Sequence, residues 1–164
     1  MRVRHTSPVR ISAKEDYAVR AALELALADG GPLKREQISQ AQKIPLAFLQ
    51  NILMELRHAE LVETQRGREG GFRLARPAAQ ITVADVVRAV SGPLATVRGA
   101  RPPVADYNAS AAPLNDLWVA LRANIRTVLE GVTLADLAAG RLPTPLRKLA
   151  DPQARTGRGR VTTR

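Results

Sequence analysis

Arginines and glycines gather in one short stretch in the first half of the sequence, residues 65–73. Its candidate functional residues are Arg66, Gly67, Arg68 and Arg73, and its only acidic residue is Glu69. A guanidinium group can donate paired hydrogen bonds to a phosphate, and glycine allows a backbone to approach another molecule closely. The stretch therefore predicts contact with the phosphates of a polyanion. A solvated charged surface is the alternative.

Side chains suited to contacting bases lie a little earlier, in a helix that the sequence predicts from Pro45 onward. The candidates there are Ala47, Gln50 and Asn51. Glutamine and asparagine can each form paired hydrogen bonds with adenine, whereas alanine offers only a methyl contact. Base reading is therefore expected mainly from Gln50 and Asn51. Solvated polar residues on an exposed helix face are the alternative.

The overall charge agrees with a polyanionic partner. The chain of 164 residues has 25 Lys and Arg against 15 Asp and Glu, a formal net charge of +10. Such a balance favours binding to nucleic acid, although a genome rich in GC codons also raises the arginine content. The placement of the charges must therefore decide, and the arginines in 65–73 stand on a predicted hairpin.

Several other kinds of chemistry lack the residues they need. With no cysteine, the chain has no disulfide, thiolate nucleophile or thiolate-held metal site. The two histidines, His5 and His58, are not grouped with other metal ligands or with a catalytic carboxylate, and no phosphate-loop spacing occurs. We expect neither an enzyme nor a metal site. No apolar run reaches the roughly 18 residues of a membrane span, and no signal peptide is evident, so we expect a cytoplasmic protein that does not bind membranes.

The periodicity of apolar residues predicts three helices followed by a β-hairpin. The helices are expected at 13–28, at 35–42 and from Pro45, and the strands at 61–64 and 72–75. Ser12 and Glu15 form a capping box for the first helix. The third helix has an apolar stripe made of Leu46, Leu49, Ile52, Leu53 and Leu56. This order is typical of a winged helix-turn-helix, whose third helix enters the major groove and whose hairpin reaches the backbone or minor groove.

The second half of the chain contains two further capping boxes. Thr82 with Asp85 predicts a helix that ends at Gly92, and Thr133 with Asp136 predicts a last short helix through residue 139. The segments around the two caps are alike in sequence, which we interpret as two uses of one cap and not as a repeat fold.

Between these caps, an apolar stripe at helical spacing predicts a long helix. Its residues are too apolar to face water and are the candidate dimer interface: Leu114, Leu117, Trp118, Leu121, Ile125 and Val128. The predicted domains are an N-terminal extension (1–10), a DNA-binding domain (11–93), a loop or linker (94–113), a dimerisation helix with a short terminal helix (114–139) and a basic disordered tail (140–164).

Several motifs resemble those of the Rrf2 family of bacterial transcription regulators. They are Ile11–Lys14 with Asp16–Ala18, Ile44–Leu49, Leu61-Val62, Arg66-Gly67 and Gly70–Ala75, and the resemblance covers Ile11 to Leu137. It implies a mainly α fold with a small β-hairpin, in which a long C-terminal helix crosses to a second copy of the chain. It also implies a homodimer that binds a palindromic operator in double-stranded DNA.

Carried over to this chain, the resemblance places Ala47, Gln50 and Asn51 on the recognition helix, and Arg66 with Gly67 on the wing. Members of the family that bind an iron–sulfur cluster have three cysteines before the dimerisation helix. The segment from Gly92 to Leu114 has none, so no iron–sulfur cluster or other cofactor is expected here. An unidentified small-molecule effector, a protein partner and constitutive binding remain open as the signal.

We therefore expect a sequence-specific DNA-binding transcription regulator that acts as a repressor. The alternative is a winged-helix interaction module that binds RNA or a protein partner without operator specificity. Residues 1–10 are predicted to be an N-terminal extension. Val9 stands where members of the family begin with methionine, so the hypothesis is that translation starts at Val9 and that the first eight residues are not translated.

Overall fold

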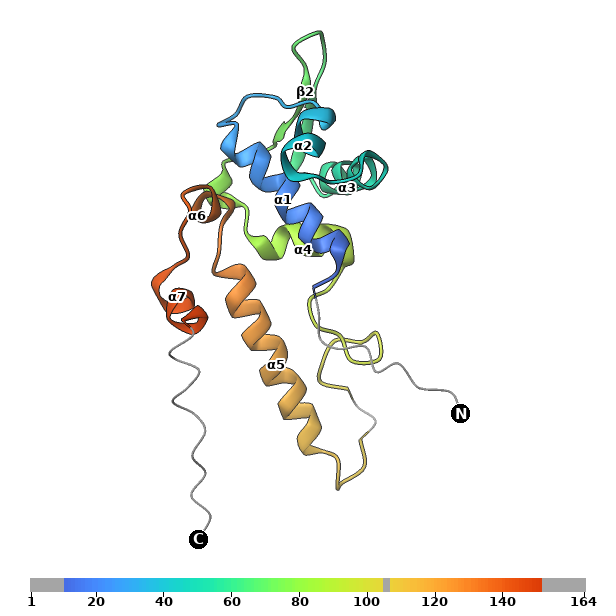
Figure 1. The fold of residues 1–164 in the computed structure, drawn as a ribbon. Coiled ribbons are helices and arrows are strands. Elements are labelled where there is room, and N and C mark those ends of the chain that lie inside the picture. Colours follow the sequence, from blue (N-terminus) through green and yellow to red (C-terminus); the bar gives the residue numbers. More distant parts are fainter. Residues whose placement is uncertain (1–10, 105–106, 152–164) are drawn as a thin grey trace.

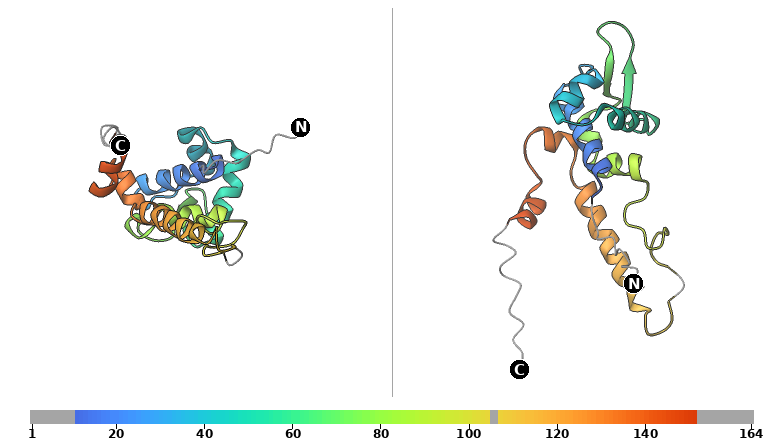
Figure 2. Two further views of the ribbon diagram at one scale, coloured as in Figure 1. Left: turned by 90° about the horizontal axis from the view of Figure 1, so that it is seen from below. Right: turned by 45° about the vertical axis from the view of Figure 1, so that its right-hand side comes forward.

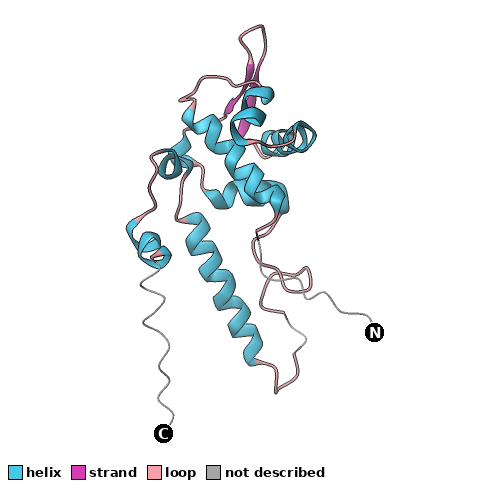
Figure 3. Ribbon diagram, viewed as in Figure 1, coloured by secondary structure: helices cyan, strands magenta, loops and turns pink. Residues whose placement is uncertain are grey.

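Helices and one β-hairpin make up the described part of the chain, residues 11–104 and 107–151 of a computed structural model. The elements are α1 (Ala13–Leu27), α2 (Arg35–Gln42), α3 (Leu46–His58), β1 (Val62–Gln65), β2 (Gly71–Leu74), η1 (Ala78–Gln80), α4 (Val83–Ser91), α5 (Pro113–Glu130), α6 (Leu134–Ala138) and α7 (Thr144–Ala150). Helices α1 to α4 and the hairpin form one body, and α5 extends away from it (Figure 1). The predicted fold class is confirmed: a mainly helical chain carries a small hairpin in the order of a winged helix-turn-helix (Figure 3).

Helix α1 lies at the centre of this body. The Glu15 backbone N–H donates to Ser12 Oγ at 3.2 Å, and the Ser12 N–H donates to Glu15 Oε2 at 2.6 Å, so the predicted capping box is confirmed. The buried face of α1 carries small side chains at Ala18, Ala21 and Ala22. Small residues at these positions allow α3 and α4 to pack closely against the helix.

Helices α2 and α3 form the helix-turn-helix. Lys43 ends α2 in the left-handed conformation, with φ of 53°, and the next residue, Ile44, is buried in the core. Four of the five residues predicted for the apolar stripe of α3 are buried: Leu49, Ile52, Leu53 and Leu56. The prediction was wrong for Leu46, the first residue of α3, which is 45% exposed.

The two strands pair antiparallel, with Glu63 opposite Arg73 and Gln65 opposite Gly71. The segment before α2 holds the base of this hairpin, because Leu33 and Phe72 exchange backbone hydrogen bonds of 2.8 Å in both directions. A Cβ on Gly71 would lie 2.4 Å from the Leu33 carbonyl oxygen, so this close approach requires glycine. The hairpin is thereby fixed to the helix-turn-helix.

The two similar capped segments contact each other. Thr82 and Thr133 form an antiparallel bridge, the Val83 N–H donates to the Val132 carbonyl, and the Leu134 N–H donates to the Ile81 carbonyl, both at 2.9 Å. Leu134 is fully buried in the same core as α1. Helix α6, which the sequence analysis grouped with the dimerisation helix, therefore belongs to the body formed by α1 to α4.

Helix α5 has no fully buried residue, as its extended position in two views shows (Figures 1 and 2). The chain then continues into α7, which corrects the expectation that the whole segment 140–164 is disordered. Pro145 in the first turn favours a helix start, and Leu146 approaches α5, since a Cβ on Gly131 would lie 3.8 Å from Leu146 Cδ1.

The predictions for residues 1–10 and 152–164 lie outside the described residues. Within the described part of the chain, none of the helices combines the length and apolar character that a membrane span needs.

Candidate nucleic-acid interface

The exposed side of α3 carries the residues predicted to contact bases. Leu49, Ile52 and Leu53 anchor the opposite side of the helix in the core, while Ala47 and Asn51 are exposed and Gln50 is half-buried. Helices α2 and α3 and the hairpin lie together at the end of the molecule away from α5 (Figures 1 and 2). The packing of α3 therefore leaves the three predicted side chains on its outer surface.

The Gln50 amide is held by a residue that sequence reasoning missed. Arg35, the first residue of α2, donates from Nη1 to Gln50 Oε1 at 2.9 Å and pairs through Nε with Glu36 Oε1 at 2.7 Å. The hydrogen bond from the Arg35 side chain lowers the pKa of the Glu36 carboxyl. With its Oε1 occupied, Gln50 presents mainly N–H donors to an incoming molecule.

The loop that joins the two strands, residues 66–70, is the tip of the wing. Arg66 and Arg68 are exposed there, and no carboxylate of the described residues lies within ion-pair distance of either guanidinium. Gly67 has φ of 104°, a conformation that side chains with a Cβ rarely adopt. A Cβ on Gly70 would lie 2.2 Å from the Gln65 carbonyl oxygen. The glycines thus make a tight turn that carries two unpaired cations.

Arg73 has a different environment from the arginines of the tip. Its Nε lies 2.6 Å from Glu63 Oε1, directly across the strand pair. Both side chains are almost half exposed, so this ion pair is solvent-screened and weak. A phosphate contact by Arg73 would have to compete with Glu63, which makes the arginine a weaker candidate than Arg66 and Arg68.

The predicted dimer-interface residues divide into two groups along α5. Leu117, Leu121 and Val128 are exposed, at 53%, 37% and 39%. Ile125 instead packs within the chain against a small cluster of Ala84, Val87 and Leu94, and Leu114 and Trp118 are half-buried. The Trp118 indole N–H donates to the Tyr107 hydroxyl at 3.0 Å, which turns one side of α5 toward the preceding loop.

An apolar groove runs beside the exposed α5 residues. It has a volume of about 670 Å³ and is bounded by α5 and by the end of α4 with the segment that follows, with Leu121 and Val128 among its lining residues. An exposed groove of this kind beside exposed leucines is suited to covering by another polypeptide.

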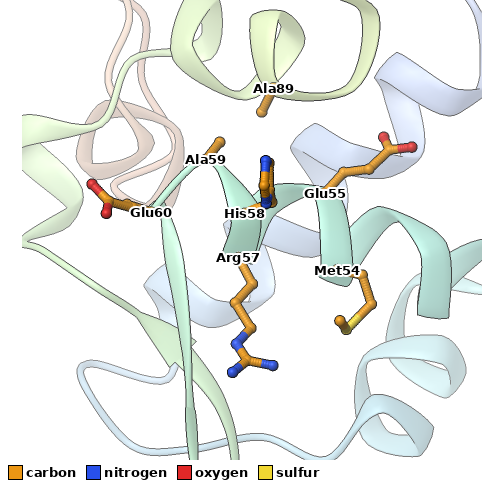
Figure 4. Close-up of a pocket in the computed structure, with 7 residues that line it drawn as sticks. All are labelled: Met54, Glu55, Arg57, His58, Ala59, Glu60 and Ala89. Carbon is orange, nitrogen blue, oxygen red and sulfur yellow. The ribbon is translucent and has the colours of Figure 1, made fainter.

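A second cavity, of about 660 Å³, lies between the C-terminal end of α3 and α4, where His58 stands between Glu55 and Glu60 and Ala89 of α4 faces the helix (Figure 4). Glu55 is paired with Lys14, whose Nζ lies 2.8 Å from Oε2. Among the described residues, no three His, Cys, Asp or Glu side chains are grouped in a way that could hold a metal ion.

Comparisons with known proteins agree with this geometry. The model of the Rrf2 family, described as an iron-dependent transcriptional regulator, matches residues 11–140. A protein of Mycobacterium tuberculosis (strain H37Rv) named as an HTH-type transcriptional regulator is 49% identical over 87% of this chain and 89% of its own. The transcriptional regulator IscR of Cereibacter sphaeroides is 36% identical over 79% and 86% of the two chains.

Among solved structures, CymR, the global cysteine regulator of Bacillus subtilis, has a TM-score of 0.69 at 30% sequence identity and covers 81% of this chain and 98% of its own. The residues matched by the family model, 11–140, include the helix-turn-helix, the hairpin and helices α4, α5 and α6. The family and the proteins compared above are transcriptional regulators and not enzymes. The chain therefore belongs to the Rrf2 family and is a DNA-binding winged helix-turn-helix transcription regulator.

Proposed function

We propose that the protein is cytoplasmic, binds a palindromic operator as a homodimer and represses transcription. In this proposal Gln50 and Asn51 contact base edges in the major groove, Ala47 makes a methyl contact, and the wing tip contacts the DNA backbone or minor groove. The proposal depends mainly on two arginines, Arg66 and Arg68, that have no carboxylate partner among the described residues. They lie on a tight turn at the same end of the molecule as the exposed side of α3 (Figure 1).

The exposed face of α5 supports the proposal of a homodimer. Its exposed leucines lie beside an apolar groove in the chain's own surface, and a two-fold arrangement would bury both. Two recognition helices related by a two-fold axis contact half-sites about one DNA turn apart, so the operator is an imperfect palindrome. A protein bound at such a site within a promoter would block RNA polymerase, and for this reason we propose repression.

The iron dependence of the family description does not extend to this chain in our proposal. Thiolates that could hold an iron–sulfur cluster are missing from the sequence. The cavity between α4, α5 and the segment before α5 is lined instead by arginines, which would repel a metal cation. Anaerobically purified protein should show no visible absorbance band of a cluster, and such a band would contradict this part of the proposal.

A mobility-shift assay tests the proposed function. The labelled probe is a DNA duplex from the region upstream of the protein's own gene, and the unlabelled competitors are the same duplex, a scrambled duplex and a single-stranded RNA of equal length. We expect a shifted band that only the same duplex removes efficiently, because base contacts add specificity to the phosphate contacts. Equal competition by all three would support the RNA- or protein-binding module instead.

A further inference from the structure

A cavity of about 440 Å³ at the junction of α4 and α5 is lined by four arginines: Arg88, Arg101, Arg122 and Arg126. They come from separate parts of the chain, since Arg88 lies on α4, Arg101 on the segment before α5, and Arg122 and Arg126 on α5. None of the residues that line the cavity lies on the wing or on α3, so the cavity is separate from the proposed DNA-contacting surface.

The carboxylates around the cavity neutralise only part of this charge. Glu130 accepts hydrogen bonds from the Arg88 and Arg126 guanidinium groups, the latter at 3.0 Å from Nε, and Asp85 lies 3.8 Å from Arg88. The hydrogen bond from Arg126, followed by the one from Arg88, lowers the pKa of Glu130, which therefore stays ionised at neutral pH. No carboxylate of the described residues lies within ion-pair distance of Arg101 or Arg122.

Arg122 adds an independent observation. Its Nε is buried and has no hydrogen-bond partner in the described part of the chain. A buried N–H group without an acceptor is destabilising, and the great majority of such groups in folded proteins are paired. This N–H, on a guanidinium group that lines a positively charged cavity, is available to an acceptor from outside the described residues.

We propose that this cavity binds a small anion with two or more negative charges on phosphate or carboxylate oxygens, and that this anion is the effector of the regulator. Guanidinium groups bind both kinds of oxyanion through paired, charge-assisted hydrogen bonds. The cavity is also of the size that small ligands occupy. Its role as an effector site rests on the proposed DNA-binding function, whereas anion binding does not.

Helix α4 connects this cavity to the recognition helix. Arg88 lines the arginine cavity, and the next residue, Ala89, lines the cavity beside the C-terminal end of α3 (Figure 4). An anion that draws Arg88 toward Arg122 competes with Glu130 for the Arg88 guanidinium and so shifts α4 relative to α5. Because α4 also packs against α3, a shift of α4 changes the placement of the surface that contacts DNA.

Isothermal titration calorimetry with citrate and, separately, inorganic phosphate tests the binding step on the full chain, at constant ionic strength set with chloride. We expect saturable binding of at least one of these probes at millimolar concentration. Arg122→Gln and Arg101→Gln should each weaken it by about tenfold or more, because each removes charged hydrogen bonds to the anion. Arg147→Gln is the matched control: Arg147 is an exposed arginine of α7 outside the cavity, and this variant should bind as the unsubstituted protein does.

Operator binding with and without the same probe tests the effector role. We expect the probe to change the operator affinity of the unsubstituted protein and of Arg147→Gln, but not that of Arg122→Gln. Failure of both probes to bind, undiminished binding by Arg122→Gln and Arg101→Gln, or dissociation of the dimer by Arg122→Gln without loss of probe binding would each overturn the anion site. Probe binding without any change in operator affinity would overturn the effector role. Failure to bind any operator, both with and without the probe, would count against the proposed function alone.

Discussion

Arg35 and Gln50 show how a neighbouring side chain sets what a recognition residue can bind. With its Oε1 accepting from Arg35, Gln50 retains its amide N–H groups, which suit acceptors such as guanine O6 and N7 or thymine O4. The paired contact with adenine, expected from glutamine alone, would require Arg35 to turn away. Asn51 is exposed and has no such partner among the described residues, so our proposal assigns the adenine contact to Asn51.

Replacing Asn51 by alanine should therefore lower operator affinity by about tenfold, since one paired base contact contributes roughly 1–3 kcal/mol of discrimination. Affinity for a scrambled duplex should stay unchanged, because phosphate contacts remain. Fluorescence anisotropy titrations on both duplexes measure the two affinities. Gln80→Ala, an exposed amide on η1, is the control, and an equal loss on both duplexes in Asn51→Ala would contradict base reading.

The arginines of the wing tip predict a different pattern. Arg66→Gln should weaken binding to all duplexes alike and reduce the slope of log affinity against log salt by about one, as expected for the loss of one phosphate contact. Titrations over a series of salt concentrations provide the slope. Arg73→Gln is the informative comparison, because Glu63 already pairs with Arg73. A larger change in slope for Arg73→Gln than for Arg66→Gln would reverse our ranking of these arginines.

At the scale of elements, the capping box of α6 stabilises the contact with the start of α4 as well as its own short helix. The Thr133 hydroxyl oxygen accepts from the Asp136 backbone N–H at 3.1 Å, and the same residue pairs with Thr82 at the start of α4. Thr133→Ala should lower the free energy of unfolding by about 1 kcal/mol, as the loss of an N-cap does. Urea denaturation measures this change.

Thr127→Ala is the matched control for that experiment. The Thr127 hydroxyl donates to the Ala123 carbonyl within α5 and is exposed, so its removal should change the stability by less than about 0.5 kcal/mol. Equal effects of the two substitutions would show that the cap of α6 does not support the contact between α4 and α6.

Local signals in the sequence predicted the helices and strands better than they predicted the contacts between these elements. The capping boxes at Ser12 and Thr133 and the hairpin glycines act over a few residues, and the structure confirms the elements they define. The pairing of Thr82 with Thr133 depends on how the chain folds back on itself, which no local pattern records.

The same distinction applies to the site residues and to the short α7 helix. Ala47, Asn51, Arg66 and Arg68 are exposed, because helix periodicity and turn composition set their positions, while their contact with DNA stays a prediction. The contact of Arg35 with Gln50 and the gathering of four arginines around one cavity are produced by tertiary packing. Helix α7 was missed because a polar, proline-containing segment has a weak helix signal until Leu146 packs beside α5.

At the scale of the whole molecule, a monomer leaves the apolar side chains on one face of α5 exposed to solvent. Leu121→Glu should convert the proposed dimer to a monomer, because it places a charge in the proposed interface beside the apolar groove. Operator affinity should then fall by about a hundredfold, since two linked half-site contacts gain that much over one. Sedimentation velocity and anisotropy titration measure the two effects.

Leu149→Glu is the control for this variant, because Leu149 of α7 is 67% exposed and lies outside the proposed interface. It should remain a dimer with unchanged operator affinity. A dimeric Leu121→Glu protein would require the interface to be sought on another surface.

Photo-cross-linking of the complex with its operator duplex, followed by mass spectrometry of the cross-linked peptides, tests the central claim most directly. The account predicts DNA adducts on the peptides that contain the first half of α3 and the wing tip, residues 46–54 and 66–70, and none on α5, which extends from the opposite end of the molecule (Figure 1). Adducts confined to α5, or spread evenly over the basic residues of the chain, would contradict it.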